Sequence, residues 1–132
     1  MPDGTDNPTT FEAVNAARKK MQSILRDKSE KRKLKAAGLY HAKLEELDAL
    51  LDLESDLNTA DALAMLRQAE ADLAHLKETT QKIEETVRGI NNVKKALKVI
   101  TATIDIAQGV MLSDGELLNA GISDALEVLD AA

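Results

Sequence analysis

The chain has 132 residues and a net charge of −6, and only 2% of its residues are aromatic. This length predicts one domain with a modest core, and the abundance of Leu, Ala, Glu and Lys is typical of helical and coiled-coil proteins. Because the chain contains no cysteine, a disulfide framework, a thiolate metal site and a cysteine nucleophile are excluded.

The polar start of the chain, residues 1–8, contains Pro and Gly and has nothing to bury, which predicts a disordered tail. A single helical domain is expected over residues 9–132. Within it, the spacing of apolar and capping residues predicts five helices, at about residues 9–37, 39–55, 59–89, 91–112 and 114–130.

The first predicted helix begins at Thr9, which has capping-box spacing to Glu12. Its apolar face gives way to charged residues after Leu25. Asp27 has capping-box spacing to Glu30, so a break at this point is an alternative to one continuous helix.

Two glycines mark further alternatives. Gly38 is either a C-cap or a tolerated interior residue of a longer helix. Near Gly89 the heptad spacing slips, which is either a stammer in a coiled coil or a short break with Asn91 or Asn92 as a new N-cap. The segment 54–59 is the clearest turn, because several residues with local capping chemistry lie there between two leucine-rich patterns.

The segment from Ile90 to Met111 carries the strongest pattern in the chain. Its apolar residues are spaced alternately three and four positions apart, which is the a/d pattern of a heptad helix. The β-branched run 99–106 could form a strand, but the heptad pattern continues on both sides of it and favours a helix. Because the segment is apolar on more than one side, more than one neighbour must cover it.

The predicted fold is all-α, a long antiparallel hairpin of coiled-coil type in which residues 9–55 pair with residues 59–112. The short C-terminal helix is expected to pack on the apolar end of this hairpin. A compact four- or five-helix bundle, with breaks near Gly38 and Gly89, would bury the same apolar seams and is the alternative.

The charges favour the hairpin. If its turn centres near residues 57–58, facing residues have numbers that sum to about 116. The basic residues Lys31 and Arg32 then face Glu85 and Glu84.

Either fold leaves an apolar end with more hydrophobic surface than two thin helices cover, which predicts an interaction surface. Seven residues are expected to form it: Ile100, Ile104, Ile106, Val110, Met111, Leu118 and Ile122. The partner is expected to be another protein or a second copy of the chain in a homodimer.

The two histidines provide the one candidate for a metal cofactor. In the hairpin register His41 and His75 lie at the same level, and helical spacing places Glu45 and Asp72 on the faces of these histidines. These four residues could bind zinc, or a manganese or iron ion, between two helices. The alternatives are surface histidines that pair with neighbouring carboxylates, or a pH-sensitive patch.

Residues 18–35 hold nine basic side chains and two acidic ones, a pattern that can bind phosphate groups or an anionic membrane. Nucleic acid is nevertheless not expected as a partner, because the net charge has the wrong sign and no binding motif is present. No catalytic residue is predicted, because phosphate-loop, dinucleotide-binding and H-E-x-x-H motifs are absent.

The first ten residues lack the apolar stretch of a Sec signal peptide, and no apolar run approaches the ~20 residues of a membrane span. A cytoplasmic location is therefore expected. A secretion route that does not read such a signal would leave no trace in the sequence.

Together these features predict a non-enzymatic protein-protein interaction module without a cofactor, in an adaptor, chaperone-like, inhibitory or structural role. A membrane-active or membrane-associated protein that uses the apolar residues 93–112 is the first alternative. A metal- or pH-responsive helical bundle is the second. The partner that covers residues 93–112 would distinguish the first two functions.

Overall fold

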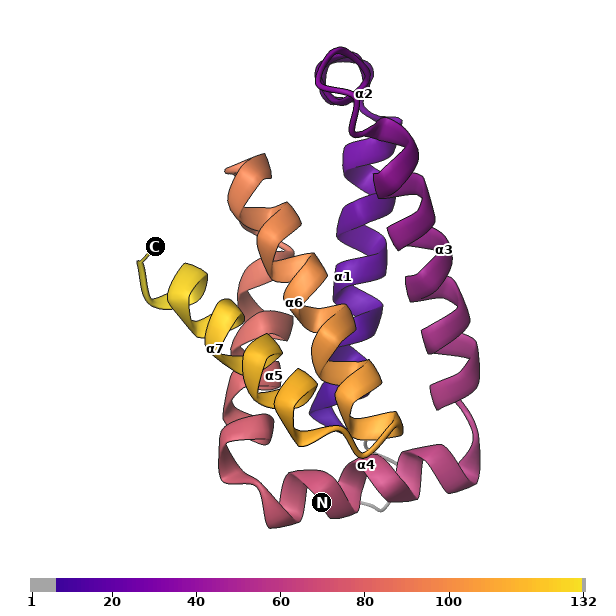
Figure 1. Ribbon diagram of the computed structural model, residues 1–132, viewed down its shortest axis with the longest axis vertical. Helices are drawn as coiled ribbons and strands as arrows, with labels where there is room; N and C mark the ends of the chain where they lie inside the picture. Colours follow the sequence, from indigo (N-terminus) through magenta and orange to yellow (C-terminus); the bar gives the residue numbers. More distant parts are fainter. Residues whose placement is uncertain (1–6, 132) are drawn as a thin grey trace.

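The computed structural model describes residues 7–131, which form seven helices and contain no strand (Figure 1). The helices are α1 (Thr9–Arg26), α2 (Lys28–Ala36), α3 (Tyr40–Leu57), α4 (Ala60–Asp72), α5 (Ala74–Val87), α6 (Val93–Met111) and α7 (Gly115–Ala131). The prediction of an all-helical chain is confirmed for this part. The predicted disordered tail, residues 1–8, lies outside the described residues except for Asn7 and Pro8.

The first predicted helix is two helices, because the chain breaks at Asp27. This residue has an extended backbone, with φ −72° and ψ 120°, and its side chain accepts a 3.0 Å hydrogen bond from the N–H of Glu30. An aspartate at this position satisfies a backbone donor in the first turn of the new helix. The alternative break at Asp27 is therefore confirmed, and the continuous helix over residues 9–37 is wrong.

The predicted helix over residues 59–89 is also two helices. It breaks at Leu73, whose φ of −124° and ψ of 95° place it in the extended region between α4 and α5. Leu73 continues the heptad seam of its neighbours in the sequence, but 43% of its surface is exposed. The chain turns from α4, which lies across one end of the molecule, to α5, which runs along its length (Figure 1), so the seam before Leu73 and the seam after it face different neighbours.

The other breaks lie where capping residues predict them. Gly38, with φ +74°, ends α2, and the N–H of Leu39 bonds to the carbonyl of Leu34 at 2.9 Å. This is the left-handed C-terminal turn that glycine favours. Thr59 and Asn92 cap α4 and α6 through side-chain oxygens that accept backbone N–H groups.

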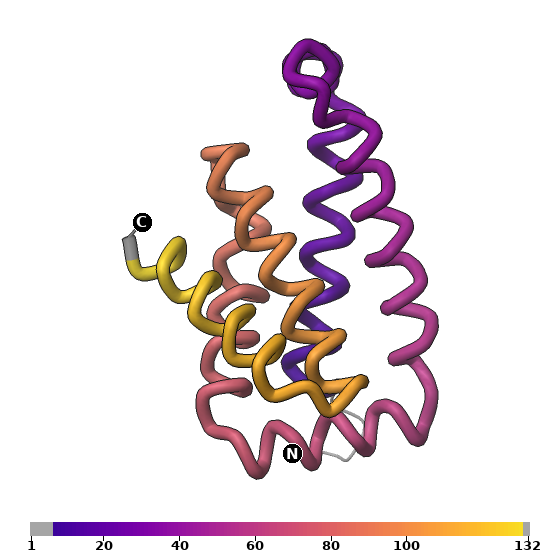
Figure 2. The backbone as a smooth tube through the Cα atoms, viewed as in Figure 1, coloured from indigo at the N-terminus to yellow at the C-terminus, as the bar shows by residue number. Residues whose placement is uncertain are grey.

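Helix α1 lies in the middle of the molecule and packs against α3, α5 and α6 (Figures 1 and 2). Helix α4 crosses one end of the molecule, and α2 lies across the opposite end. Helix α6 runs antiparallel to α1, whereas α5 runs parallel to it (Figure 2). The apolar sides of α1, α5 and α6 supply most of the buried core.

The predicted long hairpin is not the arrangement in the structure. After α2, the chain returns along α1 as α3, so the partner of residues 9–26 in the first hairpin is residues 40–57. Helix α2 contacts only α1 and α3 among the described helices, so Lys31 and Arg32 do not face Glu85 and Glu84. The breaks at Asp27 and Gly38 are the physical reason that residues 9–55 do not form one straight arm, and the break at Leu73 starts α5 in the same direction as α1.

Two polar contacts fix α1 against its neighbours. At its first turn, the carboxylate of Glu70 on α4 accepts the N–H groups of Thr9 and Thr10 at 3.1 and 2.8 Å. In its middle, Arg18 forms a two-point pair with Glu54 on α3, at 2.9 and 3.0 Å. A two-point pair fixes orientation as well as distance, so it sets how α3 lies along α1.

Candidate functional site

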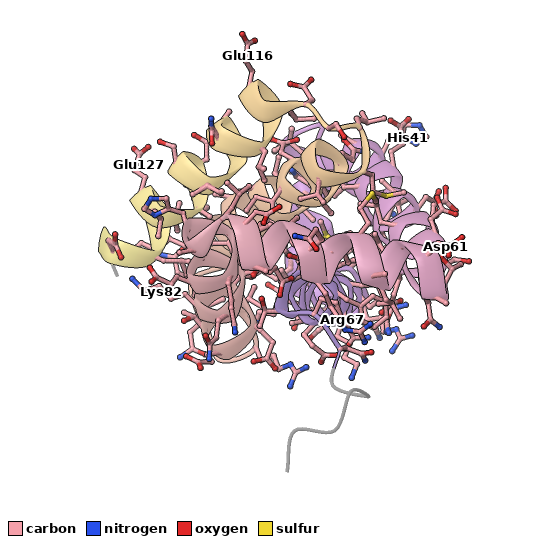
Figure 3. All side chains as sticks on the ribbon, turned by 90° about the horizontal axis from the view of Figure 1, so that it is seen from below. His41, Asp61, Arg67, Lys82, Glu116 and Glu127 are labelled. Atoms are coloured by element: carbon pink, nitrogen blue, oxygen red, sulfur yellow. The ribbon has the colours of Figure 1, made fainter. Side chains whose placement is uncertain are left out.

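The four residues of the predicted metal site are not brought together. His41 begins α3 at the end of the molecule near α2, whereas His75 begins α5 near α4, and these two helices do not contact each other. His41 lies 3.0 Å from Glu45, and both side chains are largely exposed and project outward (Figure 3). Asp72 accepts a hydrogen bond from Gln68 on its own helix at 3.0 Å.

The course of the chain causes this separation. The predicted register placed the two histidines at one level by folding the chain about a single turn at residues 57–58. In the structure α3 begins at the α2 end and runs back along α1, and α5 begins only after α4 crosses the opposite end (Figure 1), so His41 and His75 lie at opposite ends. Within residues 7–131, no group of three or more His, Cys, Asp or Glu side chains is placed to hold a metal ion.

The predicted interaction residues lie on α6 and α7. These two helices pack along each other as the largest helix pair in the structure, and α6 also packs against α1. Five of the seven residues are buried and the other two are partly buried: Ile100, Ile104, Ile106, Val110 and Leu118 in the first group, and Met111 and Ile122 in the second. The structure therefore does not place these residues on a free surface, because helices of the same chain cover them.

Two glycines allow this close cover. A Cβ atom built on Gly109 would lie 2.7 Å from the backbone nitrogen of Leu118 on α7. A Cβ atom on Gly121 would lie 2.8 Å from Cγ1 of Ile106 and 3.0 Å from the carbonyl oxygen of Ala102 on α6. Real Cβ atoms do not tolerate such distances, so the backbones of α6 and α7 approach closely because both positions lack a side chain.

The candidate site is an open groove, which we call the α6 groove, on the outer side of α6 between the start of α3 and the second half of α7. Its volume is about 600 Å³ and most of its lining is apolar. The residues that line it are Leu39, Lys43, Lys94, Leu97, Lys98, Thr101, Ala102, Asp124, Glu127 and Val128. A groove of this size on a helical protein can accept several side chains of a ligand or a partner helix.

The local sequence explains why the groove stays open. Leu39 belongs to the turn that Gly38 makes possible, and this turn leaves it 46% exposed at one edge. On α6, Lys94 and Lys98 are exposed, while Leu97 is half-buried between them. On α7, Val128 is half-buried beside the exposed Glu127. Apolar atoms therefore form the floor, and charged groups form the edges.

The charges of the α6 groove are not evenly distributed. The cations are Lys43 at the α3 edge and the exposed Lys94 and Lys98 on α6, whereas the α7 edge supplies the carboxylates Asp124 and Glu127. This separation gives the groove a preferred orientation for any charged occupant.

A polar network lies at the lower end of the α6 groove. Glu46 accepts a 2.9 Å hydrogen bond from the hydroxyl of Thr101 and lies 2.8 Å from the Nζ atom of Lys43. One turn further along α6, partial burial raises the pKa of Asp105 above its ordinary value. The negative charges of Asp124 and Glu46 raise it further. Three carboxylates thus converge where α3, α6 and α7 meet.

Sequence reasoning did not find this groove, because its lining comes from three helices whose relative placement was not known. One signal was present. Leu39 is a large apolar residue that no heptad seam includes, and such a residue can belong to a surface rather than to a core.

No helix of the described residues is both long enough and apolar enough to cross a membrane. Comparison of the whole chain with protein-family models, with curated proteins and with solved structures found no match. The function must therefore be argued from the groove and the surface charges themselves.

Proposed function

We propose that this protein is a non-enzymatic interaction module that binds an amphipathic helix of another protein in the α6 groove. The observation that carries this proposal is the apolar floor of the groove, bordered by cations on one side and carboxylates on the other. Helix-in-groove recognition uses an apolar stripe for affinity and flanking charges for orientation.

The charges specify what the occupant looks like. A helix that lies along α6 presents one flank to Lys94 and Lys98 and the other to Asp124 and Glu127. The complementary partner carries acidic residues on the first flank, apolar residues in the middle, and basic residues on the second flank. The reversed order places like charges together and costs affinity.

The test uses two synthetic helical peptides of identical composition, one with this order of flanks and one with the order reversed. We expect the first peptide to bind more tightly, as measured by fluorescence anisotropy. The double variant Lys94→Glu/Lys98→Glu should abolish this preference, because it makes both sides of the groove acidic.

A matched pair of variants localises the binding. Leu39→Glu introduces a charge at the edge of the groove, and Leu112→Glu introduces one at a leucine that is 71% exposed outside it. The first variant should weaken peptide binding about tenfold or more, since a hydrated carboxylate replaces an apolar contact. The second should bind as the wild type does. Equal effects of the two variants, or binding of neither peptide, would refute the proposal.

A second copy of the chain is the other candidate occupant. A dimer mass in native mass spectrometry that persists in Leu112→Glu and is lost in Leu39→Glu would assign the groove to self-association instead of a foreign helix.

A further inference from the structure

A second surface lies at the end of the molecule opposite α4 and is independent of the α6 groove. Helix α2 lies across this end, with its axis nearly perpendicular to the long axis of the molecule (Figure 1). Asp27 caps its start, the turn at Gly38 closes its end, and Leu34 is buried against the body. Helix α2 is thus fixed to the body of the molecule at its start, at its end and through Leu34.

The exposed side of α2 is strongly basic. Its nine residues include five cations and one carboxylate. Lys28, Lys31, Arg32 and Lys35 line a shallow hollow of about 270 Å³, which we call the basic hollow. Among the described residues, none of these four cations lies within salt-bridge distance of a carboxylate, and the one ion pair of α2 joins Lys33 to Glu30 at 3.5 Å.

Tyr40 holds part of this charge in place. Its ring lies 5.4 Å from the Nζ atom of Lys31 and 5.1 Å from that of Lys35. Cation–π contacts at such distances restrict two long side chains without neutralising them. The hollow therefore presents ordered positive charge, and the buried Leu34 on the opposite side of α2 leaves Lys28 and Arg32 facing outward.

The rest of the chain determines which anion fits. The protein is acidic as a whole, with a net charge of −6, whereas the nine residues of α2 include five cations and one carboxylate. A planar anionic surface can contact the exposed side of α2, and carboxylates that lie farther away than the screening length of about 8–10 Å at physiological salt repel it only weakly. The net charge of the protein is negative and α2 itself carries no aromatic side chain on which bases could stack, which argues against nucleic acid.

We propose that α2 is a docking element for membrane surfaces rich in anionic lipid, with the molecule standing end-on and the basic hollow against the phosphate headgroups. Clusters of four to eight basic residues on one helix bind such surfaces by charge alone. No helix need enter the bilayer, and the α6 groove stays accessible to a partner.

The test measures cosedimentation with vesicles of phosphatidylcholine, alone or mixed with phosphatidylserine. We expect binding only to the mixed vesicles, with loss of binding at high salt. The variant Lys28→Gln/Arg32→Gln should weaken it on the order of 20-fold, because each cation near the surface contributes about fivefold. The control Lys77→Gln/Lys95→Gln has the same net charge and should retain binding. Circular dichroism verifies that both variants fold.

The orientation supplies a second readout. Because the chain has no cysteine, Ser29→Cys on α2 and Asp61→Cys on α4 can each carry a single fluorescent label (Figure 3). Energy transfer to an acceptor lipid should be strong from position 29 and weak from position 61. Equal transfer, no binding to phosphatidylserine vesicles, or an equal loss in both charge variants would overturn the proposal. Tighter binding of a short DNA duplex or of polyglutamate, lost in Lys28→Gln/Arg32→Gln, would assign the hollow to that ligand instead.

Discussion

The carboxylate of Glu70 on α4 accepts a 2.8 Å hydrogen bond from the backbone N–H of Thr10, at the start of a helix sixty residues earlier in the chain. The other carboxylate oxygen accepts the N–H of Thr9. The predicted local cap, in which Thr9 pairs with Glu12, is absent, and Glu70 takes its place. Glu70 is buried, and its negative charge lies at the positive end of the dipole of α1.

The first prediction follows from this cap. Glu70→Ala should lower the free energy of unfolding by about 2–4 kcal/mol, because two buried N–H groups lose a charged acceptor. Glu70→Gln should lower the free energy of unfolding by less, since the amide oxygen of glutamine can still accept one hydrogen bond. Urea denaturation measures both, with Glu78→Ala on the exposed side of α5 as the control. Equal stability of Glu70→Ala and the control would show that the cap contributes nothing.

The cap also shows what the sequence could and could not predict. Caps made within one turn, such as those at Asp27 and Asn92, have a local spacing that is visible in the sequence. A cap supplied by a side chain sixty residues away has no local spacing, and Glu70 reads as one more charged residue on an amphipathic helix. The contact exists only once α4 crosses the start of α1.

The register of the helices could not be predicted from the sequence for a related reason. Every long segment carries a heptad seam, so many pairings bury the apolar residues equally well. The match of Lys31 and Arg32 with Glu85 and Glu84 carried little information in a chain where 30% of residues are charged. The break at Leu73 has no glycine, proline or side-chain cap to reveal it. Tertiary packing alone ends α4 there.

The second prediction concerns the contact between α6 and α7. Gly121→Ala should destabilise the protein by about 1–3 kcal/mol, because the added methyl group would overlap Ile106 and the backbone of α6. Gly109→Ala should behave alike, since Leu118 offers backbone atoms that cannot move aside. Gly89→Ala meets no atom within 4 Å and serves as the control. Thermal denaturation compares the three, and a stabilised Gly121→Ala would contradict the close approach.

The third prediction concerns pH. The raised pKa of Asp105 means that the folded protein holds this proton more tightly than the unfolded chain does. The stability therefore falls as the pH rises from the ordinary value of 3.8 through the raised pKa, and the full cost of the ionised carboxylate is present above the raised pKa. Asp105→Asn removes this cost, so it should be more stable than the wild type at neutral pH. The advantage should shrink as the pH falls through the raised pKa and vanish below the ordinary value of 3.8.

Urea denaturation over a series of pH values measures this difference. Asp52→Asn, which changes an exposed carboxylate on α3, is the control for the change of net charge. If the difference in stability between Asp105→Asn and the wild type does not vary with pH, the ionisation of Asp105 is not the source of the expected pH dependence.

The last prediction tests the direction of α5 against the hairpin that the charges favour. The hydroxyl oxygens of Thr9 and Thr80 lie 2.8 Å apart, so Thr9→Cys/Thr80→Cys should form a disulfide under mild oxidation. The bond closes a loop between residues 71 positions apart and should stabilise the protein by about 4 kcal/mol through restriction of the unfolded chain. The hairpin register predicts a different pair, Lys31→Cys/Glu85→Cys. Those residues lie on α2 and α5, which do not contact each other, so no intramolecular bond should form. Mass spectrometry and non-reducing electrophoresis distinguish the outcomes. A disulfide that forms efficiently in Lys31→Cys/Glu85→Cys, and not in Thr9→Cys/Thr80→Cys, would support the long hairpin instead.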